Sequence, residues 1–167
     1  MIERYTNPEM GNIWSDQAKY QTWLDVEIAA CEANCKLGKI PQSAMETIRT
    51  KARFKSERIL EIEEEVRHDV IAFLTNVNEY VGDAGRYIHV GMTSSDVLDT
   101  GLALQLKSSV KLLKKELLLL EEAIRDLASQ HKKTVMIGRS HAIHGEPITF
   151  GFKLAGWLAE TLRNKEK

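Results

Sequence analysis

Histidine, arginine and hydroxyl side chains gather at the predicted junctions between helices, where rigid elements can hold catalytic groups in place. Four of the five histidines lie at such junctions, namely His68, His89, His141 and His144. At one junction, Gly138 is followed by Arg139, Ser140 and His141, which supply a cation, a hydroxyl and a titratable imidazole. Arginine binds carboxylate or phosphate, and histidine exchanges protons near neutral pH. This segment therefore predicts proton transfer on an anionic substrate.

Two further junctions have side chains that suit anions. Arg67 and His68 stand beside Asp69, which could orient a neighbouring group, although an ordinary joint between helices would look the same. The segment 93–96 begins with Thr93 and Ser94 and offers three hydroxyls at the start of a long predicted helix. One hydroxyl suffices for an N-cap, and the others can join free backbone N–H groups in binding a carboxylate or phosphate. Three such junctions fit a substrate with several carboxylates or a phosphate.

Metal and cofactor motifs are weak or missing in the sequence. His141 and His144 have HxxH spacing, but the metalloprotease motif is HExxH on a helix, so a structural or substrate-contacting role is favoured. Cys31 and Cys35 are four residues apart on a predicted helix and read as reduced, half-buried thiols. Nucleotide-binding glycine motifs and zinc-ribbon spacing do not occur. The sequence thus implies no metal and no cofactor.

Capping and helix-breaking residues divide the chain into helical segments. The predicted elements of the first part are a short turn opened by Asn7 and Pro8, a helix capped by Ser15 and stopped at Gly38, a helix begun by Pro41, a helix capped by Ser56 and a helix over 69–81. A loop over 82–92 follows, then a helix from 93 to about His131, an extended segment over 134–137, and a last helix from Pro147 to Lys167. At the end of the long helix, His131 suits the helix dipole.

The long helix carries an apolar stripe from Leu98 to Leu127 and would measure roughly 50 Å. Such a helix needs packing partners beyond the first 92 residues, and the last helix ends without a cap. We therefore expect an all-α fold. A small helical N-terminal domain over 1–92 precedes the start of an elongated, truncated helical bundle over 93–167.

The composition limits the classes of protein to which the chain can belong. It has 167 residues, a formal net charge of -1 and 43% hydrophobic residues, enough for one substantial core. Near-neutral charge argues against broad binding to nucleic acid or an anionic membrane. The N-terminus MIERYTNPEM has no apolar stretch typical of a signal peptide, and no apolar run is long enough to span a bilayer. We expect a soluble, cytoplasmic protein.

Four segments resemble those of one enzyme family: IERYTNPEMGNIW, RHDVIAF, HVGMTSSDVLDT and GRSHAIHGEPITFG. They are similar, in order and over the whole chain, to bacterial adenylosuccinate lyases of the fumarase/aspartase superfamily. RHDV together with GMTSSDV separates the chain from the argininosuccinate lyase and fumarase branches. The resemblance implies a homotetramer with a twenty-helix core, in which each active site draws on three subunits. It also implies elimination of fumarate from adenylosuccinate, giving AMP, and from the succinylated aminoimidazole carboxamide ribotide.

The resemblance also implies roles for individual residues. His141 looks like the general acid, and Ser140, where many relatives have threonine, looks like a substrate contact. Thr93 and Ser94 look like carboxylate binders. The residues that look like the nucleotide and phosphate side of the pocket are Arg4, Tyr5, Arg67, His68 and Asp69. His89 is similar to a further substrate-binding histidine of the pocket, whose role is less defined. His68 is also expected to take part in catalysis.

A signature loop of the family, GSS-x-MP-x-K-x-NP, supplies the serine base and is absent from this sequence. We expect the chain to be an N-terminal portion that is inert alone, which an assay of fumarate release by this chain would test. Two alternatives remain. One is another superfamily member, such as a cycloisomerase-like enzyme, and the other is a non-catalytic helical assembly module.

Overall fold

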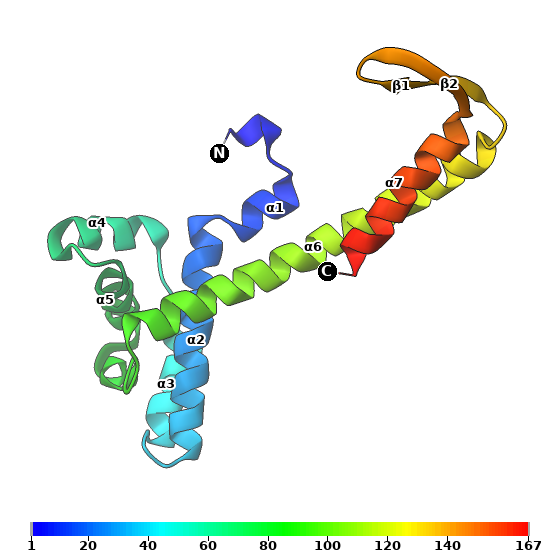
Figure 1. The fold of residues 1–167 in the computed structure, drawn as a ribbon. Helices are drawn as coiled ribbons and strands as arrows, with labels where there is room; N and C mark the ends of the chain where they lie inside the picture. The colour runs from blue at the N-terminus through cyan, green and yellow to red at the C-terminus, as the bar shows by residue number, and fades with distance from the viewer. Residues whose placement is uncertain (1, 167) are drawn as a thin grey trace. The chain divides into compact units, whose positions relative to one another are not determined.

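The structure is a computed structural model that describes residues 2–166. Its elements are η1 (Glu3–Tyr5), α1 (Pro8–Ile13), α2 (Asp16–Lys36), α3 (Gln42–Lys51), α4 (Ser56–Val66), α5 (Asp69–Val81), η2 (Gly82–Tyr87), α6 (Ser94–Gln130), β1 (Val135–Ser140), β2 (Ile143–Thr149) and α7 (Phe150–Lys165) (Figure 1). The expected all-α class is confirmed, since the two short strands are the exception in a largely helical chain. Within the described residues, no helix combines the length and the apolar character that crossing a membrane requires.

The chain forms two compact units, Met1–Ser109 and Val110–Lys167, which are described separately. Helix α6 contributes its first part to one unit and its second part to the other. The predicted domain division after residue 92 concerns the complete helical bundle and stays a prediction.

Aromatic side chains of α2 and α5 form the centre of the N-terminal unit. Tyr20 stacks on Phe73 with 6.1 Å between ring centroids, and Trp23 meets Phe73 edge-on at 5.6 Å. All three side chains are at most 4% exposed. Such burial of large apolar surface is the main favourable contribution to folding. The core fixes α2 and α5, and the N-cap and first turn of α5 carry the candidate residues His68 and Asp69.

In the N-terminal unit most predicted helix starts are confirmed, and one is displaced. Asn7 and Ser15 accept hydrogen bonds from backbone N–H groups in α1 and α2, as N-caps do. The predicted cap at Ser56 is wrong, because Lys55 is the N-cap and Ser56 is the first helical residue. The reason is tertiary: the buried side chain of Asn76 accepts the Lys55 N–H at 2.8 Å.

The predicted loop over 82–92 is more ordered than its three glycines indicate. Gly82–Tyr87 forms the 3-10 helix η2, and Ile88 is buried in the core. A turn follows, in which the Met92 N–H donates to the His89 carbonyl at 3.3 Å. Gly91 has φ +79° at the third position, as a type II turn requires. This turn leads directly into α6.

The long helix is confirmed, with 37 residues and a length of about 55 Å. Its first part packs on the N-terminal unit, where Val97 is fully buried and the Gln105 amide donates to the Ile13 carbonyl at 2.7 Å.

The C-terminal unit contains a hairpin that the sequence only partly predicts. The extended segment predicted over 134–137 is the start of β1, which pairs antiparallel with β2. The helix predicted from Pro147 is wrong at its start, because Pro147 lies in β2 opposite Ile137 and α7 begins at Phe150. Proline is tolerated in a two-stranded sheet, where both strands are edges, and the Thr149 hydroxyl provides the cap that starts α7.

Helix α7 packs against the end of α6 through a close approach of backbones. A Cβ on Gly151 would lie 2.6 Å from the Ala128 carbonyl oxygen and 2.7 Å from the Lys132 Cα. We expect Gly151→Ala to destabilise the fold by about 1–3 kcal/mol, as overpacking commonly does. A lower midpoint in denaturant unfolding would show this. Gly156→Ala, on the same helix and in open space, is the control and should be neutral or slightly stabilising. Equal midpoints for Gly151→Ala and the parent would contradict the packing.

Both cysteines are free thiols, as predicted, but their surroundings differ. Cys31 is 2% exposed, and burial raises the pKa of its thiol to about 11. At pH 8 only about one molecule in a thousand would carry the Cys31 thiolate. We therefore expect iodoacetamide to alkylate the partly exposed Cys35 first, by a factor of about 100 or more, and both thiols equally in urea. Mass spectrometry of the alkylated peptides measures this, and comparable native rates would contradict it.

Candidate functional site

The joint between α4 and α5 presents Arg67, His68 and Asp69. Arg67 closes α4 with φ 53°, and its exposed guanidinium pairs with Glu64 at 3.2 Å. His68 is the N-cap of α5, where its Nδ1 accepts the Ile71 N–H at 3.5 Å. Because Nδ1 accepts, the neutral imidazole carries its proton on Nε2. His68 therefore presents an N–H donor beside the cation of Arg67.

Asp69 is occupied within its own helix. Its Oδ1 accepts the Val70 N–H at 2.7 Å and lies 3.5 Å from His68 Nδ1. A carboxylate in the first turn also suits the positive end of the helix dipole. Asp69 thus stabilises the start of α5 and contacts the ring that precedes it.

The start of α6 is capped by its own acidic residue. Asp96 Oδ2 accepts from the Thr93 N–H at 2.7 Å and from the Thr93 hydroxyl at 3.3 Å. This arrangement resembles a capping box, in which the third helical residue reaches back to the cap. The Thr93 hydroxyl is thereby oriented, and Ser94 is the first residue of the helix. An anionic ligand at Thr93 would compete with the Asp96 carboxylate for the same two donors, the Thr93 N–H and hydroxyl.

His89 lies in the turn before α6 and is held by a buried carboxylate. Its ring Nδ1 is 2.5 Å from Glu27 Oε1, and its backbone N–H donates to Glu27 Oε2 at 2.9 Å. Burial raises the pKa of Glu27, and the hydrogen bonds from His89 lower it in part.

Sequence reasoning missed Glu27 as a site residue. The available signal was its position in the helical pattern, since the buried residues of α2 are Tyr20, Trp23, Leu24, Glu27 and Cys31. A single carboxylate on an otherwise apolar face indicates a buried charge that needs a partner.

The N-terminal segment places Arg4 and Tyr5 together in η1. The Arg4 guanidinium lies 4.8 Å from the centroid of the Tyr5 ring, and Tyr5 is 74% exposed. Both side chains are accessible to a ligand in this unit.

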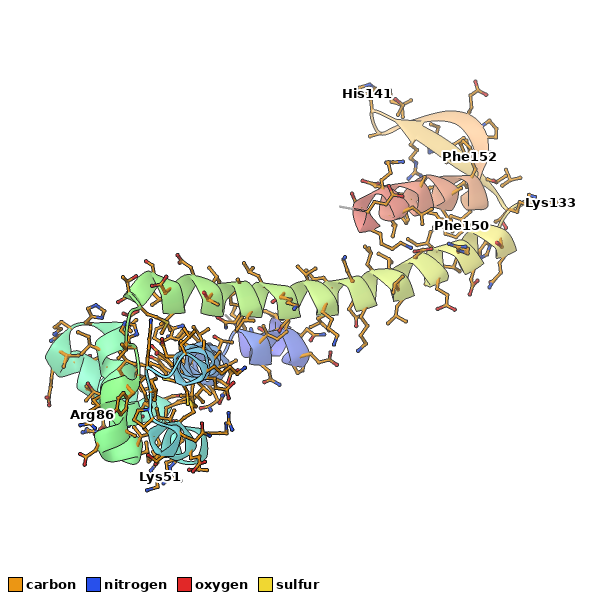
Figure 2. The ribbon with its side chains drawn as sticks, turned by 90° about the horizontal axis from the view of Figure 1, so that it is seen from below. Lys51, Arg86, Lys133, His141, Phe150 and Phe152 are labelled. Atoms are coloured by element: carbon orange, nitrogen blue, oxygen red, sulfur yellow. The ribbon has the colours of Figure 1, made fainter. Side chains whose placement is uncertain are left out.

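In the C-terminal unit, His141 and Ala142 form the turn that joins β1 and β2. Both have positive φ, 50° and 61°, which is the geometry of a type I′ turn. Figure 2 shows His141 at the tip of the hairpin, and both His141 and Ser140 are exposed. Ser140 pairs with Ile143, and Arg139 with His144. The hairpin therefore projects an imidazole and a hydroxyl from its tip.

Left-handed backbone is concentrated at the candidate residues. The non-glycine residues with positive φ in the described chain are Arg67, His89, His141 and Ala142. Each such residue costs of order 1 kcal/mol and persists where the surrounding structure imposes it, which happens often at functional sites.

The described residues contain no group of three or more His, Cys, Asp and Glu side chains placed to hold a metal ion. The structure brings His89 into contact with Glu27. His89 also lies five residues before the start of α6 at Ser94. Arg4, Tyr5, Arg67, His68, Asp69, His89, Thr93 and Ser94 lie in the N-terminal unit, and Ser140 and His141 lie in the C-terminal unit.

Comparison with known proteins gives close matches over the whole chain. A family profile described as Lyase matches residues 3–167. The chain is 70% identical over 167 residues to an adenylosuccinate lyase of Synechocystis sp. and 48% identical to that of Bacillus subtilis. Both alignments cover all of this chain, which spans 39% of the length of each relative.

Solved structures share the fold. A 3-carboxy-cis,cis-muconate lactonizing enzyme from Pseudomonas putida matches with a TM-score of 0.90 and 32% identity, over 97% of this chain and 39% of that one. A fumarate lyase from Mesorhizobium sp. BNC1 matches with a TM-score of 0.87 and 30% identity, over 96% and 38% of the two chains.

Proposed function

Because the chain belongs to the lyase family whose profile matches residues 3–167, we propose that it is the N-terminal part of an adenylosuccinate lyase. The observation that carries this proposal is the 70% identity over 167 residues to the Synechocystis enzyme. The reaction is elimination of fumarate from adenylosuccinate to give AMP, and from the succinylated aminoimidazole carboxamide ribotide.

His141 acts as the general acid in this proposal. A base from a part of the protein outside these residues removes a proton from the carbon beside a substrate carboxylate. The resulting carbanion expels the purine-side nitrogen as the carbon–nitrogen bond breaks, and His141 gives that nitrogen a proton. The exposed turn supports this role, because the imidazole can reach a ligand without displacing packed side chains. Ser140 contacts the substrate beside it.

The N-terminal unit supplies anion contacts. Arg67 offers a guanidinium, and His68 contributes its Nε2 proton and takes part in catalysis. Thr93 and Ser94 bind a substrate carboxylate at the N-terminus of α6, where hydroxyls and free N–H groups favour an anion. Arg4, Tyr5 and Asp69 complete the nucleotide side, and His89 is a further substrate-binding residue.

We also propose that the complete protein is a cytoplasmic homotetramer with active sites shared between subunits. The support is the apolar surface of α6 in the C-terminal unit, where Leu113, Leu118, Leu119 and Leu120 are each 50% or more exposed. Several large apolar side chains exposed along one helix favour an interaction surface.

The test is turnover by the full-length protein. Purified enzyme should release fumarate from adenylosuccinate and form AMP in equal amounts. Conversion of 3-carboxy-cis,cis-muconate without fumarate release from adenylosuccinate would favour the cycloisomerase alternative. Turnover of neither compound would favour the assembly module.

A further inference from the structure

Glu27 is a carboxylate that the proposed reaction leaves without a role. It is 1% exposed, in the middle of α2, among aromatic and aliphatic side chains of the core. Burying a carboxylate is unfavourable unless hydrogen bonds replace its water, and an apolar residue would fill the same space at lower cost. The presence of a glutamate at this buried position therefore directs attention to the groups that its two oxygens bind.

Both oxygens of Glu27 bind a single residue, His89. One oxygen contacts the ring Nδ1 and the other accepts the backbone N–H, at 2.5 Å and 2.9 Å. Two contacts from one carboxylate fix the backbone and the ring of His89 at the same time. They hold His89 at φ 67°, a conformation that an L-residue rarely adopts.

The carboxylate also determines which ring nitrogen of His89 faces outward. In its ionised form Glu27 only accepts hydrogen bonds, and Nδ1 then carries the proton that lies between the ring and Glu27. Within the described residues, Nε2 makes no hydrogen bond, and the side chain is 22% exposed. Nε2 is therefore the nitrogen available to a ligand.

We propose that Glu27 is a positioning residue, which orients His89 so that its Nε2 faces the substrate. This inference rests on the proposed function, because His89 has a ligand only if the N-terminal unit binds the substrate. With Nδ1 bound to Glu27, Nε2 is the ring atom that faces a polar group of the substrate, as a donor when the ring carries both protons and as an acceptor when it carries one.

The experiment is steady-state kinetics of Glu27→Gln in the full-length enzyme with adenylosuccinate. Glutamine keeps the size of the side chain but presents an NH₂ group to one of the two His89 donors. We expect KM to rise about tenfold with kcat within about threefold, since misorientation of a remote binding group removes uniform binding. Glu32→Gln, the same substitution on the exposed side of α2, where Glu32 pairs with Arg49, should leave KM unchanged.

A double-mutant comparison separates positioning from general damage to the fold. If Glu27 acts through His89, His89→Ala should raise KM by a similar factor, and adding Glu27→Gln should change it by less than about twofold more. An independent, multiplied effect would overturn the proposal, as would an unchanged KM in Glu27→Gln with wild-type turnover intact. Absence of adenylosuccinate turnover in the parent enzyme would instead contradict the proposed function.

The ring itself gives a readout that does not depend on catalysis or on a folded Glu27 variant. In the ¹⁵N-histidine-labelled parent enzyme, long-range proton–nitrogen correlations report which ring nitrogens are protonated, and His89→Ala assigns the signals. We expect Nδ1 of His89 to be protonated at neutral pH. An unprotonated Nδ1 would overturn the proposal.

Discussion

His141→Gln in the full-length protein is expected to lower kcat by about 10²–10⁴-fold, the usual contribution of a general acid. Glutamine keeps a polar side chain at the hairpin tip but cannot give up a proton at neutral pH. His141 is exposed, so its replacement removes no buried contact. The measurement is the rate of fumarate release at saturating adenylosuccinate.

The control for this variant is His131→Gln at the end of α6. His131 contacts the Thr134 hydroxyl at 3.2 Å, and glutamine can keep a hydrogen bond there. We expect its kcat to stay near that of the parent, and circular dichroism to show equal helix content in all three proteins. Near-normal turnover of His141→Gln would remove His141 from the acid role.

Arg67→Ala is expected to raise KM for adenylosuccinate by about 10- to 100-fold. A hydrogen bond to a charged group contributes roughly 1.5–3 kcal/mol, and 1.4 kcal/mol corresponds to tenfold in affinity. In the free protein Arg67 forms an exposed ion pair with Glu64. Such surface pairs contribute little to the free energy of unfolding. The fold should therefore lose little stability, which thermal unfolding would check.

Arg49→Ala is the matched control for Arg67. Arg49 forms a surface ion pair with Glu32 at 2.7 Å and lies on α3. Removal of a cation far from the α4–α5 joint along the chain should leave KM unchanged. If Arg67→Ala and Arg49→Ala behave alike, the anion contact at the joint is contradicted.

The helices of this protein follow from local signals in the sequence. Asn7, Ser15 and the stop at Gly38 act within one or two turns of the residues they cap, so local chemistry determines them. The displaced start of α4 had a different origin. The Asn76 side chain that accepts from Lys55 lies 21 residues away along the chain, and no local pattern reports such a contact.

The hairpin was predicted poorly because its turn lacks the usual residues. Type I′ turns favour Asn-Gly, and here His141 and Ala142 take those positions. Pro147 is also a good first helical residue and gave a misleading start for α7. In the same way, the sequence placed His89 in a loop but did not reveal its link to Glu27, which is 62 residues earlier. Contacts of this range depend on the packing of α2 against the turn.

The four non-glycine residues with positive φ in the described part of the chain bear on how this protein could be stabilised. Replacing Arg67, His89 or His141 by glycine would relieve backbone strain. A screen for stability alone would therefore select these substitutions, and each of them would remove a candidate site residue. Ala142 is different, because glycine there would relieve strain in the hairpin turn and leave the imidazole of His141 in place. Selection on turnover and selection on heat resistance should therefore diverge at three of these positions and agree at the fourth.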